Sequence, residues 1–127
     1  MKTAPSEERR KNVRVNGRKE AILIHPNGID QIGDISLGGL SFHCSHEEFF
    51  ADQWPVDIIF AGTPLYIPGV SVRLVGEQQD NVLNFLTLPT KKVAVEFLEL
   101  DVQNRFLLTK LVSYLDDKGQ GAHMALS

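Results

Sequence analysis

The chain has 127 residues, of which 43% are hydrophobic and 23% charged, as is typical of one soluble globular domain. Apolar runs such as residues 21–24 are only four residues long, which excludes a membrane-spanning helix, and the polar first eight residues predict no secretory signal. Cys44 is the only cysteine, so an internal disulfide is excluded and a reducing compartment, most simply the cytoplasm, is expected.

The charge is unevenly distributed along the chain. Residues 1–20 carry seven basic and three acidic side chains, a net charge of +4, whereas the remaining residues carry a net charge of −7. An acidic body repels duplex nucleic acid, whereas a small dianion can bind beneath a basic arm alone. We therefore expect a local anion site near the N-terminus and no nucleic-acid partner.

Taken in order, the chain begins with polar, basic residues 1–14, which predict a flexible arm. Short apolar runs bounded by turn residues then predict a series of strands. Ser45 as an N-cap and Glu48 as its capping-box partner favour one or two helical turns over residues 45–52, and residues 78–81 suggest a polar turn. The expected strands cover residues 20–25, 29–36, 40–44, 56–60, 70–74, 82–88 and 93–98.

The last predicted element is an amphipathic helix. Asp101 is its expected N-cap and Gly119 its expected end, and residues 119–127 are expected to be a frayed tail. The fold class predicted for residues 15–118 is mainly β, a six- or seven-stranded antiparallel β-barrel with a C-terminal α-helix packed on it. The helix would pack through an apolar stripe made of Leu107, Leu108, Leu111, Val112 and Leu115.

Two short motifs carry the functional information. The first, at the turn after residues 29–36, places Asp34 and Ser36 two residues apart, so that both side chains point to one face of the strand. It ends in a Gly-Gly pair, whose Gly39 suits backbone with positive φ. The second is Arg-x-x-x-Arg, formed by Arg10 and Arg14. Turn chemistry explains the first motif alone, but both motifs in this order arise by accident in roughly one chain in a hundred.

This pair of motifs resembles the PilZ domain family, over roughly residues 8–115. The resemblance implies a binding site for the bacterial second messenger cyclic di-GMP. Arginine suits such a ligand because its planar fork matches both a phosphate and the Hoogsteen edge of guanine, whereas lysine is a point charge. By the resemblance, the residues at the ligand are Arg10, Arg14, Asp34, Ser36 and Gly39.

Arg9 directly precedes the arginine motif. In the family, a basic residue at this position tends to accompany binding of a stacked ligand dimer, so Arg9 is included in the predicted site. A solvated charge without a role is the equally weighted alternative, and the ligand stoichiometry stays open.

The predicted function is that of a non-catalytic bacterial receptor that binds cyclic di-GMP and relays the signal to an unidentified partner protein by ordering its arm. Processes regulated in such families are motility and exopolysaccharide production. The alternative is a PilZ-like adaptor that acts by protein contact without nucleotide. We expect no cofactor and no metal site, because neighbours such as His43 and Cys44 point to opposite faces of a strand and cannot converge with His46 on one ion.

Overall fold

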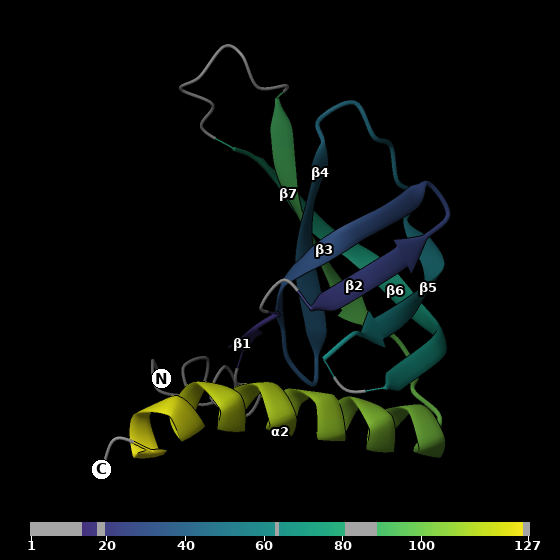
Figure 1. Cartoon of the computed structure of the whole chain (residues 1–127). Helices are drawn as coiled ribbons and strands as arrows, with labels where there is room; N and C mark the ends of the chain where they lie inside the picture. The colour runs from purple at the N-terminus through teal and green to yellow at the C-terminus, as the bar shows by residue number, and fades with distance from the viewer. Residues whose placement is uncertain (1–13, 18–19, 63, 81–88, 126–127) are drawn as a thin grey trace, which may run out of the picture.

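The computed structural model describes residues 14–17, 20–62, 64–80 and 89–125, of which 117–125 are described by backbone alone. The elements of this part are the strands β1 (Val15–Asn16), β2 (Ala21–His25), β3 (Gly28–Ile35), β4 (Gly39–Ser45), β5 (Gln53–Phe60), β6 (Leu65–Gln79) and β7 (Thr90–Phe97), followed by the helix α2 (Val102–Ala125). Figure 1 shows the strands wrapped into a barrel with α2 running beneath it.

Six antiparallel strands close the barrel. β2 pairs with β3, β3 with β4, β4 with β7, β7 with β6, β6 with β5, and β5 returns to β2. β1 adds a short extra strand on β3. The predicted fold class is confirmed. The closed ladder leaves few unpaired strand edges, which suits a small β protein.

The core fills the barrel with the inward-facing side chains of each strand. Phe42 and Phe60 are among its largest fully buried members. The helix α2 runs across the end of the barrel seen at the bottom of Figure 1, and its Leu108, Leu111 and Leu115 are buried. These three leucines belong to the predicted stripe. The helix begins as predicted, because the Asp101 carboxylate accepts a hydrogen bond of 2.7 Å from the Asn104 N–H.

An aromatic cluster fills the barrel towards the loop that follows β4. The Phe50 and Trp54 rings stack at 4.8 Å, and Phe42 meets Phe50 edge-to-face at 5.6 Å. The predicted helical turns over residues 45–52 are wrong: the Glu48 N–H donates to the Ser45 carbonyl in a single turn, and the chain then runs on without helix. Burial of Phe50 against Trp54 overrides the local capping signal.

Two predicted ends also differ from the structure. The turn expected at residues 78–81 is wrong for Gln78 and Gln79, which pair with β7 and extend β6. The helix does not end at Gly119 but continues to Ala125, since a glycine costs only about 1 kcal/mol within a helix and does not by itself end it. The strand expected at 82–88 lies outside the described residues. No helix in the described part of the chain is long and apolar enough to span a membrane.

Candidate functional site

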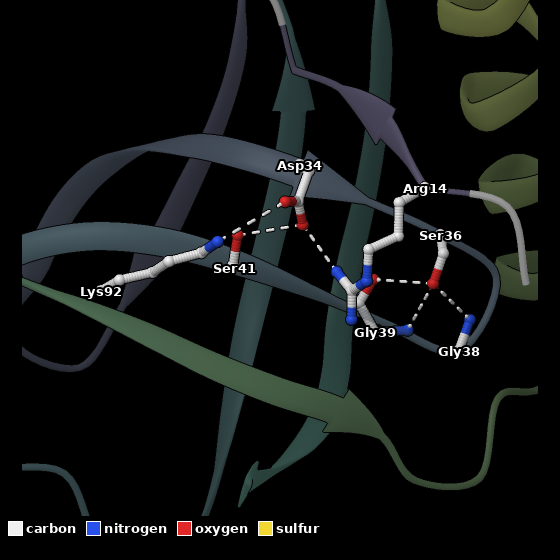
Figure 2. Close-up of polar contacts among 7 residues, drawn as sticks. All are labelled: Arg14, Asp34, Ser36, Gly38, Gly39, Ser41 and Lys92. Atoms are coloured by element: carbon white, nitrogen blue, oxygen red, sulfur yellow. Dashed lines mark hydrogen bonds and ion pairs between the residues drawn. The ribbon is translucent and has the colours of Figure 1, made fainter. Parts of the chain in front are cut away.

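Asp34, near the end of β3, lies at the centre of a polar cluster. Its Oδ1 accepts hydrogen bonds from Arg14 Nη1 at 2.6 Å and from the Ser41 hydroxyl at 2.9 Å. Lys92 Nζ lies 3.9 Å from Oδ2. Figure 2 shows Arg14 and Lys92 reaching the carboxylate from opposite sides. One carboxylate therefore lies between two cations.

The short strand β1 explains how Arg14 reaches Asp34. Val15 pairs with Ile35 and Asn16 with Asp34, and Val15 is buried. This pairing fixes the residue just before β1 next to the carboxylate, although the two residues are 20 positions apart in sequence. Of the predicted arginines, Arg14 is thus placed beside Asp34, whereas Arg9 and Arg10 lie outside the described residues.

Ser36 holds the turn between β3 and β4. Its hydroxyl oxygen accepts hydrogen bonds from the N–H groups of Gly38 at 3.1 Å and Gly39 at 3.3 Å, and the hydroxyl lies 3.3 Å from the Gly39 carbonyl. Ser36 is buried, and the Ser36 N–H donates to the Gly39 carbonyl at 2.8 Å. The structure therefore gives Ser36 a role in shaping the turn, and its contact with a ligand stays a prediction.

Gly39 is required for a different reason from the predicted one. The positive φ expected there is wrong, because the described glycines with positive φ are Gly28 and Gly69. A Cβ atom at position 39 would instead lie 2.2 Å from the Val95 carbonyl oxygen and 3.0 Å from the Glu96 Cα. Glycine lets β4 approach β7 closely here, and any side chain would push the two strands apart.

A cavity of about 390 Å³ opens beside this cluster, which is within the range of small-ligand sites. It is lined by Arg14, which directly precedes β1, and by residues of β3, β4, β6 and β7, so four neighbouring strands contribute to one surface. Ser36 and Gly39 lie outside its lining. The lining residues are Arg14, Asp34, Ser41, Gly76, Glu77, Gln78, Lys92 and Ala94.

Lys92 and Ser41 were not among the predicted site residues. The alternation of buried Val93 and Val95 with Ala94 indicates that Lys92 faces outward. The missing information was that β7 pairs with β4, since a strand pairing across about 50 residues has no local signal in the sequence.

Asp80 and Cys44, which do not line the cavity, have shifted pKa values. The Thr90 hydroxyl, helped by His43, lowers the pKa of Asp80, and both contact the same carboxylate oxygen at 2.6 and 3.0 Å. Burial, reinforced by the charge of Asp30, raises the pKa of Cys44 to about 11. Among the described residues, no group of three or more His, Cys, Asp or Glu side chains could hold a metal ion.

These features define a class of protein: a small closed β-barrel with a helix across one end and an outer cavity lined by an arginine, a lysine and a carboxylate. The PilZ domain family model matches residues 8–116, a range that includes both motifs. The chain belongs to the PilZ domain family.

Several solved structures have a similar fold. The PilZ domain of YcgR from Escherichia coli, solved with c-di-GMP, is 12% identical, with a TM-score of 0.69 over 91% of this chain and 97% of that one. MrkH from K. pneumonia, in complex with c-di-GMP, is 15% identical with a TM-score of 0.69 over 88% of this chain. PlzA from Borreliella burgdorferi, also in complex with c-di-GMP, is 16% identical with a TM-score of 0.59 over 94% of this chain.

The chain spans only about half of two of these proteins, 53% of MrkH and 56% of PlzA. At such low identities the likeness concerns the fold alone. No curated protein sequence matches the chain significantly.

Proposed function

We propose that this chain is a non-catalytic receptor for cyclic di-GMP, and that the ligand binds at the cavity beside Asp34. The observation that carries the proposal is the contact between Arg14 and Asp34, which belong to two separate motifs and meet at one cavity 2.6 Å apart. Membership of the PilZ family and the c-di-GMP complexes of YcgR, MrkH and PlzA support the choice of ligand.

The two side chains complement different parts of the ligand. A guanidinium has five N–H donors, of which the contact with Asp34 uses Nη1, and its fork can pair with a phosphate or with guanine O6 and N7. The Asp34 carboxylate can accept from guanine N1–H and N2–H. Arg10, the first arginine of the Arg-x-x-x-Arg motif, would supply a second guanidinium group, and Arg9 would supply a further positive charge.

The energies favour opening of the ion pair by the ligand. The Arg14 side chain is 48% exposed and that of Asp34 is 29% exposed, and such a pair stabilises a protein by only about 0–1 kcal/mol. A hydrogen bond to a charged group contributes about 1.5–3 kcal/mol. A ligand that offers both a phosphate and a guanine edge therefore gains more free energy from its hydrogen bonds to Arg14 and Asp34 than is lost when their ion pair opens.

Isothermal titration calorimetry with cyclic di-GMP tests the proposal. We expect a Kd in the sub-micromolar to micromolar range, about −8 to −10 kcal/mol, and weaker binding by about 1.5–3 kcal/mol for Arg14→Ala and for Arg10→Ala. Arg105→Ala removes the same charge from an exposed position on α2 and should bind like the wild type. A wild-type protein that does not bind at about 1 mM ligand would refute the receptor and favour an adaptor that acts by protein contact.

We further propose that binding orders residues 1–14 over the barrel and so changes the surface offered to a partner protein. The support is that β1 already brings Arg14 to the cavity, so a ligand held by Arg10 and Arg14 would draw the preceding residues towards it. Amide hydrogen exchange across residues 5–18 should slow on adding ligand. Equal exchange with and without ligand, under conditions of saturated binding, would contradict this relay.

A further inference from the structure

The cavity has a floor of small side chains that neither motif supplies. Asp34 pairs with Ser41, Ser41 with Ala94, and Ala94 with Gly76, so these residues form one row across the outer surface of β3, β4, β7 and β6. All four line the cavity. The row therefore forms a trough that starts at the motif carboxylate and ends at Gly76.

Gly76 needs an explanation, because glycine inside a strand costs roughly 0.5–1 kcal/mol relative to alanine. The register shifts between Leu74 and Gly76, and a bulge of this kind sometimes requires a glycine with positive φ. Gly76 does not have positive φ, and a Cβ atom placed on it would have no atom within 4 Å. Neither backbone conformation nor packing requires glycine here, so what it preserves is the empty space above the strand.

Lys92 forms a side of the same trough. It pairs with His43 on β4 and with Gln78 on β6, one outward-facing row away from Ala94. Its side chain is 42% exposed, and its Nζ lies 3.9 Å from Asp34 Oδ2, beyond a hydrogen bond. The neighbouring Glu77 already pairs with Lys91 at 2.8 Å. Lys92 is therefore a cation at the cavity that is only loosely held by its nearest carboxylate.

We propose that the trough over β4, β7 and β6 is part of the cyclic di-GMP site, with Lys92 as a contact to a ligand phosphate and Gly76 leaving room for the ligand above β6. This inference rests on the proposed function. Arg14 and Lys92 approach Asp34 from opposite sides (Figure 2), and two cations with a carboxylate between them complement a ligand that has two anionic phosphates and a guanine donor edge. Arg14 alone would place positive charge on only one side of the carboxylate.

The first test is calorimetric titration of cyclic di-GMP into Lys92→Met, which removes the charge and keeps the length of the side chain. We expect affinity to fall about tenfold and to depend less steeply on ionic strength than in the wild type, because one screened charge contact is lost. Lys110→Met removes an exposed lysine on α2 and should leave both the affinity and its salt dependence unchanged.

A second measurement separates contact with the ligand from positioning of Asp34. If Lys92 contacts the phosphate, Lys92→Met should weaken binding by a similar factor in an Asp34→Asn background. If the effect of Lys92→Met disappears in that background, Lys92 acts only through the carboxylate and the proposed contact is wrong.

Gly76→Val tests the trough itself. We expect a folded protein with an unchanged melting profile and affinity at least about tenfold weaker, with the salt dependence of the wild type. Ser71→Val, on an exposed position of the same strand, should bind normally. If the wild type binds and Arg14→Ala does not, but Lys92→Met and Gly76→Val bind like the wild type, this inference fails and the receptor function stands. If the wild type does not bind, the receptor function itself fails.

Discussion

Replacing Gly39 with alanine should destabilise the barrel at the turn that carries the motif. The added Cβ would lie 2.2 Å from the Val95 carbonyl oxygen and 3.2 Å from its carbonyl carbon. These are backbone atoms of the paired strand β7, so no flexible side chain can move aside. β4 and β7 must separate by roughly 1 Å to restore an ordinary contact.

The magnitude follows from two costs. Overpacking in a tightly packed region costs about 1–3 kcal/mol. Separation of the strands also strains the turn, in which the Gly39 N–H donates to the Ser36 hydroxyl and the Gly39 carbonyl accepts from the Ser36 N–H, and a weakened hydrogen bond costs about 1 kcal/mol. Together we expect a loss of about 3 kcal/mol, a large part of the roughly 5–15 kcal/mol that stabilises a domain.

Urea unfolding followed by circular dichroism measures this loss, and a thermal melt should show Tm lower by roughly 10 °C. Gly76→Ala is the matched control, because position 76 also has ordinary φ but no atom within 4 Å of an added Cβ. It should be neutral or stabilising by up to about 1 kcal/mol. If the two variants are equally stable, the close approach of β4 to β7 does not explain the glycine.

Three further experiments test the turn, the core and the helix. Ser36→Ala should cost about 1–3 kcal/mol in urea unfolding, because two turn N–H groups lose their acceptor, whereas Ser71→Ala should cost under about 0.5 kcal/mol. The thiol of Cys44, whose pKa is raised to about 11, should react with Ellman's reagent at pH 8 only in urea. The free energy of unfolding should be independent of this thiol below about pH 9 and should fall above about pH 9, because the thiol ionises more readily in the unfolded chain than in the folded one. Asp101→Ala should lower the free energy of unfolding by about 1 kcal/mol through loss of the N-cap, and an effect near zero would contradict that role.

The sequence predicted the fold well where the signals are local. Alternation in residues 93–97 and the apolar stripe of residues 107–115 each depend on the burial of one face of one element, and the structure buries those faces. The order of the first three barrel strands also follows from short connections. The barrel closes through the pairings of β4 with β7 and of β2 with β5, which join segments that are far apart in the sequence. The number of predicted strands was the only indication of this closure in the sequence.

Sequence reasoning about the site named two residues that the structure brings together, but it did not find the residues that surround them. Arg14 and Asp34 were both predicted, and the structure brings them into contact. The reason given for Gly39 was wrong, because a close approach of two strands leaves the same trace in the sequence as a positive φ. The position of Lys92 could not be predicted, because it lies beside Asp34 only when β7 is placed next to β4.

Lys91 and Lys92 illustrate this limit, because two adjacent lysines are expected to have opposite roles. Successive side chains of a strand point to opposite faces, and the Lys91 side chain is only 5% exposed whereas that of Lys92 is 42% exposed. Lys91 Nζ donates to the Glu48 carbonyl at 2.6 Å and to Glu77 Oε1 at 2.8 Å. Lys91 therefore ties the loop after β4 to β6 and β7.

Lys91→Met should accordingly lower the free energy of unfolding, whereas Lys92→Met should not. Removal of one partner of a buried ion pair costs about 3–5 kcal/mol, and because Glu77 is 34% exposed and regains solvent, we expect about 2–3 kcal/mol. Lys92→Met should change stability by less than about 0.5 kcal/mol and act on ligand binding instead. Urea unfolding of both variants beside cyclic di-GMP titration makes the comparison. Equal losses of stability would mean that the two lysines do not differ in burial as the strand alternation requires.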